Sequence, residues 1–542
     1  MGLPVVSTVV ESWHLFSAKE RRNIALYILG IMLYKFGLEA FNGSITALAT
    51  NRYDYDAEVA GTPKKTFERV GLLQGLNQAF QCVGAILIAP LIKRWPTRLV
   101  LSCAIVMFGL LTAILLIVDA ATGGRIRPSS ITDDEDFSYY GDYNTDGMIP
   151  IYTIAGIAYG MVELIRRVIP RDIVGGNVQK LRRMDALVHI FYEVAGTSGA
   201  FCTALGLIPA LGNNMSFIIT PICFALAAIS WFFISNLGFM STDLEKVDSP
   251  NYFKAILNGA RLFVVSVWTG AKLIFTSRKM FWLLPGYTIA LYGHRYLENG
   301  IAPAIARRYL GNSAWSQIMV GGSNFGELLG ALFVFLFTNF IKTPIPWLRL
   351  DALTLLIVWY LPYWNPPRND VSQAWIVAAT FLPVSFGWAA GDVSLAAYIQ
   401  ATLARKESEE KDLSPLGAVM AFLYATYIVM YAIASPLLGR YVDRINTQND
   451  GDISPAIQNI AGVQFTLICV IVLSATLIPK GALALNPQNL YGEKLDRDLD
   501  EEYAQEVKDG DELAKDAGSS NDEKEVLEHA ARKGSVTVPG VL

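Results

Sequence analysis

The chain has 542 residues, of which 53% are hydrophobic and only 17% are charged, and its mean hydropathy is +0.36. Soluble domains carry about a quarter charged residues, so this composition argues against a string of soluble domains. The formal net charge of −4 offers no basic surface to nucleic acid, and we expect no nucleic-acid partner. The charge is also uneven. Residues 480–542 contain 15 acids and 8 bases, whereas residues 1–479 contain 36 bases and 33 acids, so the hydrophobic body and the acidic tail are separate parts.

The cysteines and the N-terminus narrow the class of protein further. The five cysteines lie in apolar stretches and form no CxxC pair, which predicts buried thiols rather than a disulfide framework or a zinc site: Cys82, Cys103, Cys202, Cys223 and Cys469. We therefore expect no metal and no cofactor. No short apolar core with a small-residue cleavage site stands at the N-terminus, and Glu20-Arg21-Arg22 precedes a long apolar run. This pattern predicts that the first apolar span is retained.

Apolar stretches long enough to cross a membrane recur along the chain. A hydrocarbon core about 30 Å thick takes about 20 mostly apolar residues per helix. Reading with that window predicts twelve spans, at 24–49, 70–92, 99–118, 149–170, 184–208, 217–236, 281–303, 315–338, 348–364, 374–399, 415–438 and 459–479. The predicted fold class is an all-α integral membrane protein with two bundles of six helices, at 24–236 and 281–479. A cytoplasmic segment (1–23), a linker (237–280) and an acidic, disordered tail (480–542) complete the predicted organisation.

Basic residues gather in alternate short loops and predict the orientation. The loops after spans two and four contain Lys93, Arg94, Arg98, Arg166, Arg167, Arg171, Lys180, Arg182 and Arg183, whereas the loop after span three is acidic. Even-numbered loops and both termini are therefore expected in the cytoplasm. We expect a multi-pass protein of the plasma membrane, with a vacuolar or other internal membrane as the alternative.

The linker contains a stretch that is apolar at helical spacing. Lys254, Arg261 and Lys272 are interspersed in segment 252–275. This pattern predicts an amphipathic helix, which either lies on the inner membrane surface or packs against the bundle.

The two sets of six spans repeat parts of their sequence. Five residues of span four recur 231 residues later in span ten: Gly156, Ala158, Gly160, Val162 and Leu164 correspond to Gly387, Ala389, Gly391, Val393 and Leu395. Spans two and eight share Gly84-Ala85 and Gly330-Ala331, and spans one and seven share Leu38-Glu39 and Leu297-Glu298. Their common order indicates a duplicated six-helix unit, which is typical of rocker-type secondary transporters.

This layout resembles the major facilitator superfamily over about residues 24–479. The family's loop between spans two and three reads Gly-x-Leu-x-Asp-Arg-x-Gly-Arg-Arg, and Leu91, Arg94 and Arg98 match it, whereas Lys93 replaces the acid that helps to latch the cytoplasmic gate in the family. Gly196-Thr-Ser-Gly199 looks like a degenerate antiporter signature without its proline, and we interpret it as helix packing. The long acidic loops and tail have a fungal or other eukaryotic look. The resemblance implies a central cavity surrounded by spans one, four, seven and ten.

Polar side chains at membrane depth are costly, so each is a candidate functional residue. The predicted substrate and proton pathway consists of Lys35, Glu39, Gln74, Asn77, Gln81, Glu163, His189, Glu193, His294, Arg295, Glu298, Asn324, Glu327 and Asp392. The predicted cytoplasmic gate loop consists of Lys93, Arg94, Arg98, Arg166 and Arg167. The alternative for each charge is a pair that holds two helices in register, and for Glu163 we prefer that gate or structural interpretation.

The predicted function follows from these charges. A carboxylate at membrane depth can load and release a proton as access alternates, so we hypothesise that Glu39 or Glu298 couples transport to protons, with Lys35 and His294–Arg295 as partners. The sequence contains no GxxxxGK[ST] loop and no catalytic motif in a soluble loop, and we expect no enzyme. The leading hypothesis is proton-coupled efflux of a small organic solute by a monomer in a lipid bilayer. Proton-coupled uptake, facilitated diffusion and a transporter-like sensor are the alternatives.

Overall fold

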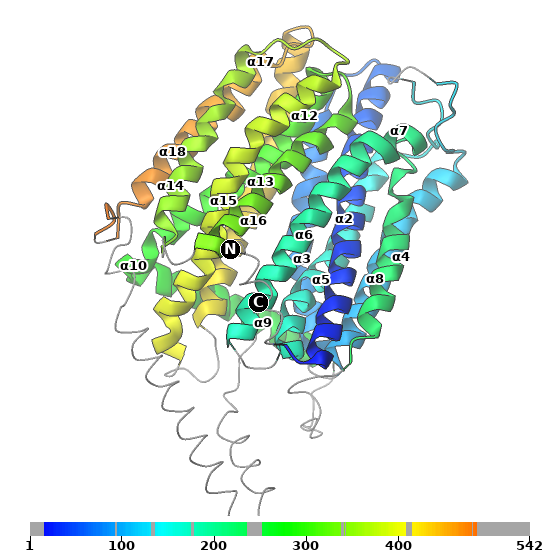
Figure 1. Ribbon diagram of the computed structural model, residues 1–542. Coiled ribbons are helices and arrows are strands. Elements are labelled where there is room, and N and C mark those ends of the chain that lie inside the picture. The colour runs from blue at the N-terminus through cyan, green and yellow to red at the C-terminus, as the bar shows by residue number, and fades with distance from the viewer. Residues whose placement is uncertain are drawn as a thin grey trace, which may run out of the picture.

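The computed structural model describes residues 16–92, 95–131, 136–174, 178–235, 252–337, 341, 343–407, 415–479 and 481–484. Every regular element within these ranges is a helix (Figure 1). Most of the predicted N-terminal segment and nearly all of the predicted acidic tail lie outside the described residues.

Six membrane-crossing segments make up the N-terminal half. Ser17 and Glu20 form a capping box that starts the first helix, because each side chain bonds to the other's backbone N–H. The segments are α2 (Ala18–Val59), α3 (Thr66–Ile92), α4 (Thr97–Ala121), α5 (Met148–Val174), α6 (Val178–Cys202) with η2 (Thr203–Leu207) and α7 (Ile208–Leu211), and η3 (Ser216–Ile218) with α8 (Ile219–Phe232). At 1.5 Å per residue α2 is roughly 63 Å long, so it extends well beyond a hydrocarbon core.

Six more segments make up the C-terminal half. The seventh is divided into α10 (Arg278–Phe281), η4 (Leu284–Thr288), α11 (Ile289–Tyr296), η5 (Leu297–Ile301) and α12 (Ala302–Arg308). The others are η6 (Ser313–Trp315) with α13 (Ser316–Phe337), α14 (Ile345–Thr354) with η7 (Leu355–Tyr363), α15 (Val371–Glu407), α16 (Pro415–Gln448), and α17 (Ser454–Ile457) with η8 (Gln458–Val463) and α18 (Gln464–Ala475). In chain order, α9 (Tyr252–Thr276) lies between the two halves. Helices lie at all twelve predicted spans in the predicted order, although several run past the predicted ends.

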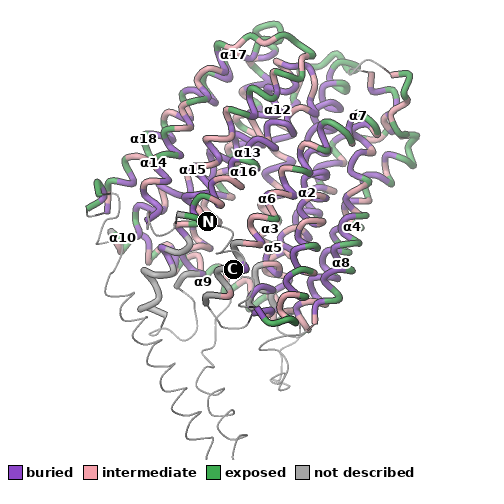
Figure 2. Tube along the Cα trace, in the orientation of Figure 1, coloured by how far each residue is buried: buried purple, intermediate pink, exposed green. Residues whose placement is uncertain are grey.

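The helices present a surface suited to lipid. Within the described residues, ten helices are long and apolar enough to cross a membrane, and α9 is one of them. Large apolar side chains are exposed on outward faces, such as Leu110 and Ile117 of α4 and Ile222 and Ile229 of α8 (Figure 2). In water such a surface would be unfavourable, whereas in a bilayer it meets acyl chains. The protein is thus an integral, multi-pass membrane protein.

Each half has its own core. One cluster of buried apolar side chains is built from residues 16–234, and the largest other cluster is built almost entirely from residues 274–472. In both halves, glycines of the internal repeat let helices approach closely. A Cβ on Gly84 of α3 would lie 1.9 Å from the carbonyl oxygen of Ile157 in α5, and a Cβ on Gly330 of α13 would lie 2.3 Å from that of Phe386 in α15. The repeat therefore encodes the same helix contact twice.

The two ends of the molecule differ in how they are covered. We call the end at which α2 begins the lower end and the opposite end the upper end, as in Figure 1. At the upper end the α4–α5 connection folds over α2, because the buried Arg52 donates to the carbonyl oxygens of Gly141 and Tyr143 at 2.8 and 2.7 Å. This connection covers one side of the cavity at the upper end that is described with the candidate site below.

The cysteines correct one expectation. Cys223 and Cys469 are buried as predicted, but Cys103 and Cys202 are exposed. The expectation was wrong for these two because an apolar stretch in a membrane protein also supplies the lipid-facing side of a helix, where a thiol behaves as a small hydrophobe.

Candidate functional site

A buried ion pair on α2 lies at the centre of the molecule. Lys35 donates to Glu39 one helical turn further on, as the spacing predicts, and both side chains are about 10% exposed. The ammonium group also lies 4.6 Å from the centre of the Tyr192 ring of α6. Gly196 makes room for this arrangement, because a Cβ there would lie 2.5 Å from Cε of Lys35. The glycines of the degenerate signature therefore pack α6 against α2, as we interpreted them.

The seventh segment supplies the equivalent pair in the other half. Arg295 donates to Glu298 at 3.0 Å, and Ser323 of α13 donates to the other carboxylate oxygen at 2.5 Å. Glu298 lies in η5, a π-helical turn, and such turns are frequent at functional sites. The Arg295 side chain is 44% exposed. Its charge interacts electrostatically with Tyr159, Glu327 and Tyr427, which come from both halves. Arg295 is therefore the more accessible member of this pair.

Polar atoms without partners follow one side of α6 and continue onto α13. His189 Nε2, Glu193 Oε2 and Thr197 Oγ1 recur at every fourth residue of α6, and each is buried without a hydrogen-bond partner among the described residues. Asn324 Nδ2 of α13 is also buried without a hydrogen-bond partner among the described residues. A Cβ on Gly196 of α6 would lie 3.3 Å from this nitrogen. Buried polar groups are nearly always satisfied, so a row of four such atoms at a contact between the bundles makes this place a candidate ligand site. The sequence did not single out Thr197, although its spacing from Glu193 could have done so.

The charges at this site do not balance. The Glu193 carboxylate interacts electrostatically with the charges of Lys35, Glu39, Arg295 and Glu298. The Glu327 carboxylate in turn interacts with those of Glu193 and Glu298. Four carboxylates and two cations thus meet at this site, beside the Glu163–Arg166 pair, whose guanidinium lies over the same Tyr192 ring as Lys35. A charge at the bilayer centre costs about 3 kcal/mol on insertion scales, so an unmatched carboxylate there favours a proton or a cationic group as its partner.

Other predicted pathway residues hold helices together. Three amides predicted on one face of α3 are used in packing: Gln74 donates to Thr46, Asn77 donates to the carbonyl oxygen of Tyr152 at 2.8 Å, and Gln81 donates to Asn77. Glu163 pairs with Arg166 at 2.6 Å and accepts a bond from Tyr34 at 2.9 Å. These contacts lie within the N-terminal half.

The structure places His294 away from its predicted partner. Its Nε2 lies 2.6 Å from Asp351 of α14, its ring stacks on Trp388 with centroids 5.0 Å apart, and both members of the pair are buried. In this structure His294 therefore pairs with Asp351 and not with Glu298, because the ring points into the C-terminal bundle, and its proposed role as a switchable partner of the coupling carboxylate stays a prediction. Asp392 also turns into that bundle and accepts a bond from Tyr287 at 2.8 Å.

The predicted lower gate loop is only partly visible. Arg98 donates to the carbonyl oxygen of Ile234 at 2.8 Å, which joins the start of α4 to the end of α8. Lys93, Arg94 and the Arg167 side chain lie outside the described residues.

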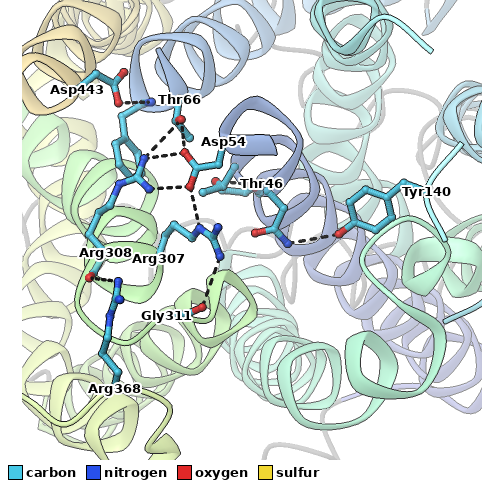
Figure 3. A network of polar contacts seen from close by, with 12 residues as sticks. Thr46, Asp54, Thr66, Tyr140, Arg307, Arg308, Gly311, Arg368 and Asp443 are labelled. Atoms are coloured by element: carbon cyan, nitrogen blue, oxygen red, sulfur yellow. Dashed lines mark hydrogen bonds and ion pairs between the residues drawn. The ribbon is translucent and has the colours of Figure 1, made fainter. Parts of the chain in front are cut away.

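A second ionic cluster joins the halves at the upper end (Figure 3). Asp54 near the end of α2 accepts one bond from Arg307 at 2.8 Å and two from Arg308 at 2.6 and 2.7 Å. Asp443 of α16 accepts bonds from the backbone N–H groups of Phe67 and Glu68, and so caps the first turn of α3 from the opposite half. We call Asp54, Glu68, Arg307, Arg308, Arg440 and Asp443 the upper lock. It holds the two halves together at this end.

The upper lock was missed by the sequence analysis. Asp54 and the pair Arg307–Arg308 stand near the ends of their spans, where charges are ordinarily exposed to water. One signal was present, since opposite charges end the first and seventh spans, which correspond in the repeat.

A cavity of about 240 Å³ lies beside the upper lock, between the α4–α5 connection and the α12–α13 connection. Arg127, Phe137, Arg307 and Trp315 are among its lining residues. Two more, Asn51 and Asn213, both donate to the hydroxyl oxygen of Tyr140 at 3.3 Å, and their own side-chain oxygens lack partners. Burial raises the pKa of the Tyr140 phenol, which keeps it neutral as an acceptor. The upper end thus offers a polar recess beside the upper lock.

Comparisons with known proteins identify the fold. No protein-family model matches the sequence, and no curated protein matches it. Among solved structures, the chain is similar to a D-xylose-proton symporter, with 12% identity, coverage of 86% of this chain and 98% of that chain, and a TM-score of 0.55. A peptide transporter POT gives 12% identity, 86% and 100% coverage and a TM-score of 0.52. The nucleoside transporter NupG, in a mutant form, gives 14%, 85% and 100%, and 0.50. These likenesses confirm the predicted fold class, the twelve-helix major facilitator fold.

Proposed function

We propose that the protein is a secondary active transporter that moves a small organic solute by alternating access and couples the movement to protons. The observation that carries the proposal is the central site, where four carboxylates and two cations meet and a row of orphaned polar atoms lies between the bundles. Similar folds in a nucleoside transporter, a D-xylose-proton symporter and a peptide transporter support transport as the activity.

The geometry suits alternating access. The upper lock closes the site from one side, and Gly71 of α3 would place a Cβ only 2.7 Å from the backbone of Ser435 in α16, so the halves also touch closely in their upper parts. Separating these contacts opens the central carboxylates to the upper solution. We place the lower end in the cytoplasm, because Arg98, Arg166 and Lys180 gather there.

Glu298 is our first choice for the coupling carboxylate, and Glu39 is the second. Each has a cation on its own helix, so a proton can replace the cation as partner when the solute binds. Solute recognition falls to Glu193, Thr197 and Asn324, whose orphaned atoms provide donors and acceptors.

The test is solute-driven proton movement in proteoliposomes that contain a trapped pH-sensitive dye. Nucleosides, monosaccharides and short peptides are added in turn on each side, which also determines direction. We expect at least one class to move protons with the wild-type protein. Glu298→Gln should reduce that flux at least tenfold while solute binding persists.

The matched control is Glu58→Gln, which removes a carboxylate from an exposed position near the upper end of α2. It should behave as the wild type. Solute flux without proton movement would show facilitated diffusion, and saturable binding without any flux would show a sensor; either result would sink the proposal.

A further inference from the structure

The linker helix α9 is apolar enough to cross a membrane, but its contacts place both of its ends at the lower end of the molecule. Near its start, the Tyr252 hydroxyl donates to the carbonyl oxygen of Leu87, five residues before α3 ends at the lower side. Near its end, the Phe275 ring packs against Phe422, seven residues after α16 begins there. A helix whose two ends both lie at the lower side does not span the bilayer.

The same contacts make α9 a bridge between the halves. Its first half touches α3, where a Cβ on Gly259 would lie 3.9 Å from Ile86. Its second half touches α16, where a Cβ on Gly270 would lie 2.0 Å from the carbonyl oxygen of Ala418. Gly270 and Ile274 are buried in this contact. The helix therefore lies across the lower ends of one helix from each bundle.

A second side of α9 is apolar and largely exposed. With about 100° per residue, five of the exposed apolar side chains fall on one stripe beside the buried side, and two more, Leu262 and Val265, lie beyond the basic residues described below. The stripe consists of Phe253, Leu257, Val264, Trp268 and Phe275, and Phe253 and Trp268 are 77% and 75% exposed. In water this stripe would be costly, so it needs an apolar phase beside the bundle.

A third side of α9 is basic. Lys254, Arg261 and Lys272 fall on one line next to the apolar stripe, and all three are exposed. The helix contains no Asp or Glu at all. An apolar stripe rich in aromatic residues beside a purely basic one is the pattern of a helix that lies at the boundary between acyl chains and headgroups.

We propose that α9 lies in the lower membrane interface and binds anionic lipid headgroups through Lys254, Arg261 and Lys272. Charge complementarity selects an anionic leaflet over a neutral one, and the apolar stripe selects a membrane over a soluble acidic partner. Because α9 touches both halves, bound lipid also acts on their relative position. That last consequence rests on the proposed function, whereas lipid binding does not.

The test is a lipid titration of the full-length purified protein, followed by native mass spectrometry. Phosphatidylserine and phosphatidylcholine are the two probes. We expect the wild type to prefer phosphatidylserine and to lose the preference at high salt. Replacement of Lys254, Arg261 and Lys272 by Gln should weaken phosphatidylserine binding by roughly fivefold for each basic side chain removed.

The matched control removes three exposed basic residues from the upper side: Lys65→Gln, Arg125→Gln and Arg444→Gln. It should keep the preference for phosphatidylserine. An unchanged preference in the α9 variant, or an equal loss in the control, overturns the proposal. If the α9 substitutions have an effect only while residues 485–542 are present, the acidic tail is the occupant of the basic stripe and the proposal is again wrong.

A photocrosslinker at Leu257 gives a second measurement that leaves the basic residues intact. In liposomes of phosphatidylcholine and phosphatidylserine it should capture lipid, whereas the same group at the exposed Thr62 near the upper end should capture none. Absence of lipid adducts at Leu257 contradicts a membrane location for the stripe.

Discussion

Asp54→Asn is the most direct test of the upper lock. In the structure the Asp54 side chain is 2% exposed and accepts three hydrogen bonds from two guanidinium groups of the other half. Asparagine keeps the shape of the side chain but loses its charge and one acceptor oxygen, and its amide group then faces two cations. The substitution therefore perturbs the closed upper end, where these groups meet, and has little effect once they are separated and hydrated.

The structure sets the size of the effect. Removing one partner of a buried ion pair costs about 3–5 kcal/mol, because the other charge is left buried without compensation. The Asp443 cap and the glycine contacts stay in place, so we take the lower value. A change of about 3 kcal/mol in one state alters a two-state equilibrium roughly 100-fold. Asp54→Asn should thus populate forms with a separated upper end.

Pulsed electron spectroscopy on spin labels measures this separation. Labels at Glu58→Cys and Asn449→Cys lie at exposed positions near the upper ends of α2 and α16, one in each half, in a background with the native cysteines replaced by serine. We expect a single short distance with Asp54 and an added longer one with Asp54→Asn. Asp56→Asn, two residues away and exposed, is the matched control. An identical distance distribution for Asp54→Asn and the control would refute the role of the upper lock.

Three further substitutions test other parts of the structure. Gly84→Ala should destabilise the protein severely, because its Cβ would lie 1.9 Å from a backbone oxygen of α5, and thermal unfolding in detergent should show a lower midpoint. Tyr140→Phe removes the acceptor shared by Asn51 and Asn213 and should lower stability by about 1–3 kcal/mol, whereas Tyr363→Phe at an exposed position should not. Asp351→Asn should lower stability and leave proton coupling intact, because the His294–Asp351 pair lies inside one bundle; loss of coupling at unchanged stability would place the pair in the proton pathway.

The number and order of the helices were predictable from the sequence, because the apolar length of each span is a local property. The charged pairs within one helix were predictable for the same reason. Lys35 and Glu39 lie one turn apart on α2, and Arg295 and Glu298 do so on the seventh segment, so spacing alone brings them together.

Contacts between helices were beyond reach of the sequence. His294 could turn toward Glu298 on its own helix or toward Asp351 on α14, and only packing around Trp388 decides for the latter. The Asp54–Arg308 contact joins residues 254 positions apart. The internal repeat does not predict every contact either. Gly156 packs against α3, whereas the corresponding Gly387 packs against Asp351 of α14.

The two ionic clusters differ in charge balance. Under the proposed function, this difference gives the upper lock and the central site different roles. The upper lock contains three carboxylates and three guanidinium groups, and each of its carboxylates accepts hydrogen bonds from within the protein, so its formal charges balance without a ligand. The central site contains four carboxylates and two cations, so it is satisfied only when a proton or a cationic group joins it. A lock that needed a ligand would stay open in its absence and leak, and a central site that needed none would have no reason to bind one. Under the proposed function, the unbalanced charges therefore lie at the central site, which both halves can reach, and the balanced charges lie at the upper lock.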